Sequence, residues 1–281
     1  MKNKFTVITP CFNAERYIED TVLSVLNNKA VINQDIELEY IICDGASTDQ
    51  TIPIIEKIFS QATYNHIQLD LQSKKDSGMY AALAAGLKRA TGNTISYLNA
   101  GDLYSPHAFE IVNTVFSKSE IKWITGLTIL YNEYNHMISA WLPFKYRRQL
   151  IQCGFYDGRL PFIQQETTFW RNDLLSLIDL QKLASLRFAG DFYLWKKFSE
   201  QTDLFIIEAW LGGWKIHQGQ ISADLQSYKK EMHSLAKRPT ISNYLAYIFD
   251  RLHFLLPNDL KKRLNRETII RFDLKQQRYT R

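Results

Sequence analysis

The chain has 281 residues, 46% hydrophobic and 22% charged, so it is long enough to bury a full core and lacks the composition of a disordered protein. It contains no run of about 18 apolar residues and its N-terminus lacks the apolar region of a signal peptide, so we expect neither a membrane span nor secretion. The cysteines Cys11, Cys43 and Cys153 are odd in number and lack CxxC spacing, which argues against a disulfide framework and a zinc site and fits a cytoplasmic protein.

The first hundred residues alternate strand and helix signals. The β-rich run FTVIT ends at Pro10, and Ile18, Val22, Val25 and Leu26 then recur at the spacing of one helix face. The same alternation continues to residue 98. In chain order we predict a strand at 5–9, a helix at 18–26, a strand at 38–43, a helix at 52–59, a strand at 66–72, a helix at 79–90 and a strand at 94–98.

Strands separated by helices of this length predict an α/β fold with a mainly parallel central sheet flanked by helices. Ligands of such sheets bind outside the carboxyl ends of the strands. The loops that follow the predicted strands there are rich in polar and small residues. They are residues 9–13, 44–49, 75–78 and 99–102.

Asp44 directly follows a hydrophobic strand, and Gly45 permits a tight turn after it. A carboxylate in this position can accept a hydrogen bond from a nucleobase N–H or from ribose hydroxyls, although turn chemistry alone would also favour an aspartate there. Asp49 fits a different role, as a cap of the following helix.

The C-terminal part of the chain is basic. Residues 225–281 contain 13 Lys and Arg against 5 Asp and Glu, a net charge of +8; because the whole chain is +5, residues 1–224 carry −3. We therefore divide the chain into a domain at 1–222 and a basic amphipathic helical extension at 223–281. The run YLAYIFDRLHFLLP followed by KKRLNR fits a helix on an anionic membrane surface and equally a packed helix with a solvated basic face.

Seven short blocks occur in an order that points to a family. The chain resembles the soluble bacterial branch of the family 2 glycosyltransferases over about residues 4–222. The resemblance implies a GT-A fold, a nucleotide-diphosphate sugar donor and inversion at the anomeric carbon. Among such donors it favours a UDP-sugar. The blocks are VITPCFNAERYI, DGASTDQT, DSGMYAALAAGLKRATG, YLNAGDLY, IQQETTFWR, FAGDFYLWKKF and LGGWKIHQGQIS.

The resemblance also assigns the nucleotide site. Carried over position by position, Thr9 and Pro10 line the nucleotide pocket, Asp44 binds the base, and Asp76 lies near the ribose or diphosphate.

For the metal, Asp102 matches the last acid of the family's DxD-like motif, and His217 falls where a residue often approaches the diphosphate or metal. Gly101 stands where the family commonly has a further acid. One aspartate can still suffice for Mn²⁺ or Mg²⁺, because diphosphate oxygens and water fill the remaining positions. His217 alone also fits an ordinary surface or packed histidine.

For the chemistry, Asp191 matches the carboxylate taken as general base, and Glu166 and Trp170 fall where the acceptor and the donor sugar are held. Each has a second interpretation from the residues themselves: Asp191 as a helix cap and Trp170 as core.

The chain departs from the family at Ala81, Ala84 and Ala85, where members commonly have Asp, Asn and Lys. These alanines leave the donor's identity, and activity itself, open.

The sequence therefore predicts an inverting, metal-dependent glycosyltransferase acting on a glycan or lipid-linked acceptor, cytoplasmic and either soluble or peripheral on the inner face of the membrane. A non-catalytic sugar-nucleotide or glycan-binding protein and a sugar-nucleotide nucleotidyltransferase stay as alternatives. The latter would normally show a glycine-rich phosphate loop, which TPCFNAER lacks. No nucleic-acid partner is expected, because the basic residues are confined to the tail and no recognition motif accompanies them.

Overall fold

The computed structural model describes residues 2–117, 120–216 and 224–280. Its first four strands pair in parallel, as their connecting helices require, and they confirm the predicted alternation. In spatial order they run β4, β1, β2, β3. They are β1 Lys4–Cys11, β2 Glu37–Asp44, β3 Gln68–Ser73 and β4 Thr94–Tyr97.

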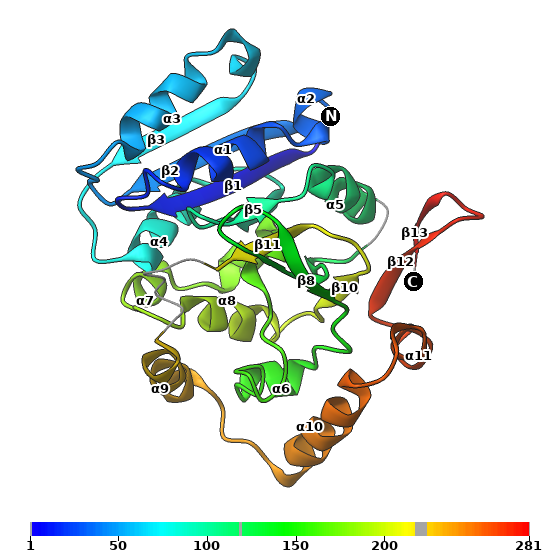
Figure 1. Cartoon of the computed structure of the whole chain (residues 1–281). Coiled ribbons are helices and arrows are strands. Elements are labelled where there is room, and N and C mark those ends of the chain that lie inside the picture. The colour runs from blue at the N-terminus through cyan, green and yellow to red at the C-terminus, as the bar shows by residue number, and fades with distance from the viewer. Residues whose placement is uncertain (1, 118–119, 217–223, 281) are drawn as a thin grey trace.

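Helices cover both faces of this sheet. In Figure 1, α1 and α3 lie above β1 and β2, and α4 lies below them with α7 and α8. Each layer buries its own apolar core against the sheet. The α-helices described before residue 217 are α1 Ile18–Leu26, α2 Lys29–Ile32, α3 Thr51–Phe59, α4 Met79–Arg89, α5 Ala108–Ser117, α6 Arg148–Gln152, α7 Leu180–Ala184 and α8 Gly190–Phe198.

The sheet continues beyond β4 with mixed pairing. β9 Phe169–Arg171 lies antiparallel between β4 and β6 Trp123–Thr125, and β10 Phe205–Ile207 pairs in parallel with β6. A smaller sheet packs beside it. Its strands, in spatial order, are β5 Leu103–Tyr104, β11 Gly212–Lys215, β7 Thr128–Tyr131 and β8 Met137–Trp141.

The C-terminal region differs from the purely helical extension that the sequence predicted. After α9 Leu225–Leu235, α10 Ile241–Phe254 and α11 Asn258–Leu264, the chain forms β12 Ile269–Asp273 and β13 Arg278–Thr280. β12 pairs in parallel with β10 and buries Ile269 and Ile270, so it extends the central sheet. The short run TIIRF carries a β-branched strand signal that the sequence analysis passed over.

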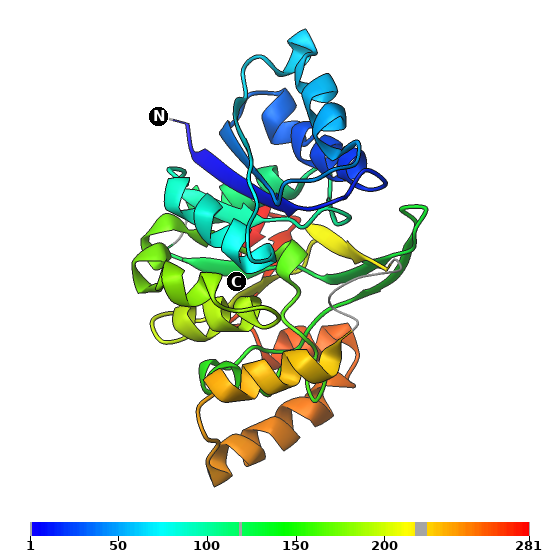
Figure 2. The ribbon, with the colours of Figure 1, turned by 90° about the vertical axis from the view of Figure 1, so that its left-hand side faces the viewer.

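The three C-terminal helices lie along one end of the molecule, opposite the end formed by α3 and β3, in two perpendicular views (Figures 1 and 2). No helix among the described residues is long and apolar enough to cross a bilayer.

Candidate active site

Asp44 ends β2 and is 2% exposed. Its carboxylate accepts hydrogen bonds from the backbone N–H of Ser47 at 2.9 Å, from the Ser73 hydroxyl at 2.6 Å, and from the Ser47 hydroxyl. Cys11 lies beside it, and burial, with the Asp44 charge, raises the pKa of the Cys11 thiol far above its usual range. Cys11 therefore stays a thiol and serves as packing.

Asp49 is structural, but it is not the N-cap that the sequence predicted, because that position of α3 belongs to Gln50. Its Oδ1 accepts from the backbone N–H and the hydroxyl of Thr51, the first residue of α3, and its Oδ2 accepts from the backbone N–H of Glu15. These bonds tie the loop after β1 to the loop after β2, and so hold the walls of the site together.

Phe12 is a site candidate that the sequence analysis did not single out. It is 62% exposed although it follows a buried strand. A Cβ atom at Gly45 would lie 3.2 Å from the Phe12 ring and 3.3 Å from the Asp76 carboxylate, so glycine lets the ring and the acid approach the same turn. An aromatic residue in a polar loop at a strand's carboxyl end was the signal that could have found it.

Thr9 and Pro10 lie behind this surface. Both are buried in β1, and the Thr9 hydroxyl is 3.0 Å from the Tyr40 hydroxyl. Their side chains therefore pack inside the sheet and offer no exposed surface to a ligand. Asp76 itself is exposed and accepts from the backbone N–H of Gly78 at 2.9 Å.

Asp102 lies between β4 and β5 and is 4% exposed. Its Oδ1 accepts from the backbone N–H of Lys215 in β11 at 3.1 Å, and its carbonyl accepts from the Thr21 hydroxyl at 2.9 Å. Gly101 before it has φ +115°, which only glycine adopts without strain, and donates its N–H to the same hydroxyl. The backbone thus fixes where the Asp102 carboxyl points.

Glu166 faces Asp102 in the interior. Burial raises the pKa of Asp102 well above its usual range, and the neighbouring charge of Glu166 raises it further. Burial likewise raises the pKa of Glu166 to about 7, with the charge of Asp191 adding to the effect and hydrogen bonds opposing it. Burial and the neighbouring negative charges therefore favour the protonated form of both carboxyl groups.

The Asp102–Glu166 pair is also a candidate metal site. Among residues 2–117, 120–216 and 224–280, no group of three or more His, Cys, Asp or Glu side chains is placed to hold a metal ion. Two carboxyl groups are nevertheless enough for Mg²⁺ or Mn²⁺ beside a diphosphate, and their raised pKa values mark a place where added positive charge would be favourable. Asp102 and Glu166 supply carboxyl oxygens of the kind these ions bind; His217 lies outside the described residues.

Asp191 is the second residue of α8, and the cap position belongs to Ala189. The interpretation of Asp191 as a helix cap is therefore wrong. Its Oδ1 accepts from the backbone N–H of Phe192 at 2.6 Å, and its Oδ2 lies 3.5 Å from the Tyr228 hydroxyl. Burial raises the pKa of Asp191 to about 6, although these hydrogen bonds act in the opposite direction.

The C-terminal region helps to hold Asp191 in place. Glu231 in α9 accepts the backbone N–H groups of Arg187, Phe188 and Ala189, at 3.0, 2.7 and 2.7 Å. Its neighbour Tyr228 contacts Asp191 directly. Sequence reasoning placed both outside the catalytic domain, because no local pattern in α9 indicates a partner 40 residues earlier.

The chain has room for Asp191 only because glycine precedes it. A Cβ atom at Gly190 would overlap the ring of Tyr80, whose hydroxyl donates to the Phe188 carbonyl at 3.1 Å. The close packing of Tyr80 on this turn links α4 to the start of α8.

Trp170 lies in the core. It is fully buried in β9, and its ring lies 5.9 Å from that of Trp195 and 6.3 Å from that of Tyr97. It has no exposed surface to offer an acceptor or a sugar, so the prediction of a ligand contact at Trp170 is wrong. Trp170 is instead part of the aromatic packing of the hydrophobic core.

The three alanines that depart from the family occupy different environments on α4. Ala84 is buried in the core, Ala81 is partly exposed, and Ala85 is exposed. Only Ala81 and Ala85 therefore bear on what the surface of the site can contact.

Comparisons with known proteins identify the family. The family model described as "Glycosyl transferase family 2" matches residues 6–149, just over half of the chain. An uncharacterized glycosyltransferase of Nostoc sp. is 32% identical over 118 residues, 42% of this chain and 34% of that protein. The minor teichoic acid biosynthesis protein GgaA of Bacillus subtilis is 31% identical over 129 residues, 45% of this chain and 28% of that protein. The chain thus spans about a third of the length of these relatives.

Solved structures share the fold at low identity. S. aureus TarS in complex with UDP-GlcNAc aligns with a TM-score of 0.58 and 18% identity, covering 94% of this chain and 70% of that one. The mannosyltransferase PcManGT from Pyrobaculum calidifontis, in complex with GDP-Man and Mn²⁺, aligns with a TM-score of 0.56 and 15% identity, covering 93% and 72%.

Proposed function

We propose that this chain, which belongs to glycosyl transferase family 2, moves a sugar from a nucleoside-diphosphate donor to a hydroxyl of a glycan or lipid-linked acceptor. The transfer would invert the configuration at the anomeric carbon. UDP-sugar is the donor we favour, since TarS, which shares the fold, was solved with UDP-GlcNAc. The observation that carries the proposal is the Asp191 carboxyl, held with a pKa of about 6 at the carboxyl side of the sheet by groups from two other helices.

The nucleotide would bind at the carboxyl ends of β1 and β2. The exposed Phe12 ring would stack on the base, and Asp44, oriented by Ser47 and Ser73, would accept a hydrogen bond from the base or ribose. Asp76 would lie toward the ribose or diphosphate. Thr9 and Pro10 would shape the pocket from behind.

The sugar transfer would use Asp191 as base. Inversion needs an acceptor oxygen that attacks the anomeric carbon from the face opposite the leaving nucleoside diphosphate. Asp191 would take the proton from that hydroxyl as the new C–O bond forms and the bond to the diphosphate breaks. A pKa near 6 leaves the carboxylate mostly ionised at pH 7 and keeps it basic enough to accept a proton.

Asp102 and Glu166 would hold Mn²⁺ or Mg²⁺, and His217 stays a predicted further ligand. When bound, the ion would neutralise charge on the diphosphate. A binding measurement tests this assignment without turnover: UDP should raise the melting temperature more with Mn²⁺ than without it, and Asp102→Asn should remove that difference. A difference that persists in the folded variant would contradict the assignment.

Ala81 and Ala85 favour a second candidate, a sugar-nucleotide-binding protein without catalysis, because they remove polar groups from the donor side. Two measurements separate the candidates. Nucleotide sugars are first screened by thermal shift with Mn²⁺, and the ligand that binds is then incubated with glycan and lipid-linked acceptors. Release of nucleoside diphosphate that depends on acceptor supports the transferase, whereas tight binding without turnover across the acceptor panel supports the binding protein.

A further inference from the structure

Helix α10 buries two polar residues and exposes large aliphatic ones. Asn243 and Asp250 are 8% and 1% exposed, while Ala246 and Tyr247 pack partly buried against the core. Asp250 accepts two hydrogen bonds from the Arg147 guanidinium, at 2.7 and 2.9 Å, and Asn243 caps the helix by accepting from the backbone N–H of Thr240 at 2.8 Å. The helix is therefore attached by the Arg147–Asp250 pair and by the rings of Tyr244 and Tyr247, which lie 5.4 and 5.2 Å from the ring of Phe155.

The outer side of α10 is apolar. Large aliphatic side chains recur at steps of four and three residues, which in a helix of 3.6 residues per turn forms one stripe, opposite Asn243 and Asp250. This stripe continues past the helix end, and α11 adds Leu260 and Leu264. The outer stripe is Ile241, Leu245, Ile248, Leu252 and Leu255, between 53% and 81% exposed.

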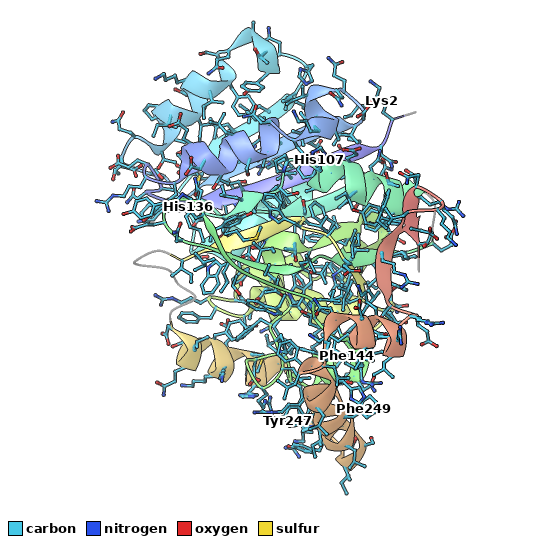
Figure 3. All side chains as sticks on the ribbon, turned by 45° about the vertical axis from the view of Figure 1, so that its right-hand side comes forward. Lys2, His107, His136, Phe144, Tyr247 and Phe249 are labelled. Atoms are coloured by element: carbon cyan, nitrogen blue, oxygen red, sulfur yellow. The ribbon has the colours of Figure 1, made fainter. Side chains whose placement is uncertain are left out.

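The stripe lies on a projecting end of the molecule. Figures 1 and 2 place α10 at the end opposite α3 and β3, and Figure 3 shows Phe249 and Tyr247 at the same end. An apolar stripe on a projection suits a broad, deformable surface better than it suits a rigid pocket.

Basic side chains border the stripe. Arg238 precedes α10, and Arg263 and Arg266 lie in and after α11; all three are exposed and form no ion pair within 4.0 Å among the described residues. Two acids of α10 and α11 are neutralised, since Asp250 pairs with Arg147 and Asp259 with Lys262. Glu267, beside Arg266, is exposed and forms no ion pair within 4.0 Å in the described part of the chain, so the basic side chains still outnumber the free acids here. A second copy of the chain would bring the same positive charges together, which disfavours self-association through this face.

We propose that the outer stripe of α10, with the neighbouring end of α11, docks on an anionic lipid bilayer. The aliphatic side chains would enter the boundary between headgroups and acyl chains, and the arginines would contact lipid phosphates. The proposal goes beyond the transferase assignment and does not depend on it. Where both hold, the enzyme works on the inner face of the membrane, within reach of a lipid-linked acceptor.

The test uses the full chain and sedimentation with vesicles. We expect binding to vesicles of phosphatidylcholine and phosphatidylglycerol in roughly equal parts, weaker binding to phosphatidylcholine alone, and a loss of affinity as salt is raised. The double variant Leu245→Ser, Leu252→Ser should bind anionic vesicles at least about 10-fold more weakly, and Arg263→Gln about fivefold.

Controls separate docking from misfolding. Ile138→Ser removes an equally exposed aliphatic side chain from β8, outside the stripe, and should bind vesicles like the parent. The melting temperature and the UDP-induced shift should be unchanged in all variants, because the stripe contacts no part of the site. Truncation after residue 224 is unsuitable, because it also removes Tyr228 and Glu231.

Two results would overturn the proposal. The first is a parent that ignores anionic vesicles at low salt. The second is a double variant that binds them as well as the parent does. If ultracentrifugation shows a parental dimer that the double variant loses, with no vesicle binding by either, the stripe is a contact between copies and the lipid assignment falls.

Discussion

The candidate site has one end around Asp44 and another around Asp191, and the two carboxylates have different hydrogen-bond environments. At the Asp44 end, both carboxylate oxygens accept from close donors supplied by Ser47 and Ser73. At the Asp191 end, Oδ1 accepts from the N–H of Phe192 and Oδ2 lies 3.5 Å from the Tyr228 hydroxyl. Hydrogen bonds from Tyr228 and Tyr80 lower the pKa of Asp191, but burial outweighs them. Donors fix a carboxylate in its ionised, oriented form, whereas burial with few donors leaves it able to take up a proton. Under the proposed function, the first end would hold the nucleotide and the second would carry out the proton transfer.

The two ends also differ in how much of the chain builds them. The Asp44 end, where the nucleotide is proposed to bind, is built from β1, β2, β3 and their loops, within the first 78 residues. The acid end collects Asp102, Glu166, Asp191 and, from α9, Tyr228 and Glu231. Under the proposed function, the proton transfer would therefore depend on the C-terminal region, and nucleotide binding would not.

The largest expected effect is at Asp191. Asp191→Asn keeps the size of the side chain and removes proton acceptance, so transfer should slow roughly 10² to 10⁴-fold while UDP affinity stays parental. The melting temperature, measured on the same preparation, shows whether folding contributes. Near-parental turnover would remove Asp191 as base and move that role to Glu166.

A smaller effect, on UDP affinity rather than on the transfer rate, is expected at Asp44. Asp44→Ala should weaken UDP binding about 10 to 100-fold, the cost of losing a hydrogen bond that involves a charged group. Asp49→Ala is the matched control: it lies in the same loop but ties loops together, so it should lower stability and leave UDP affinity nearly unchanged. Equal losses of affinity in both variants would make Asp44 a loop residue only.

The smallest effect concerns stability. Because burial raises the pKa of Glu166 to about 7, its ionised form destabilises the fold, and the favourable protonated state is lost as pH rises through 7. Glu166→Gln should therefore raise the free energy of unfolding at about pH 8 by roughly 1 to 2 kcal/mol, with little gain at about pH 5. The exposed Glu133→Gln should change neither value. A Glu166→Gln protein that is less stable at pH 8 would show that the carboxylate is a needed partner.

The sequence predicted the fold around Asp44 because the signals there are local. Hydrophobic periodicity predicted the four parallel strands and α1, α3 and α4, and the position of Asp44 at the end of a strand placed it at the carboxyl edge of the sheet. The acid end was predicted in part: Asp102, Glu166 and Asp191 do converge, although Trp170 proved to be core. Tyr228, Glu231 and β12 were missed, since their roles arise from packing between segments far apart in the chain.

The pH dependence of kcat/KM tests most directly the claim that the acid end supplies the base, because it reports the essential ionisations of the free enzyme. With Asp191 as base and a pKa of about 6, kcat/KM should fall about tenfold per pH unit below that value, and Glu166→Gln should keep the same acid limb. A parent whose kcat/KM stays flat down to about pH 5, or an acid limb that disappears in Glu166→Gln, would contradict the account.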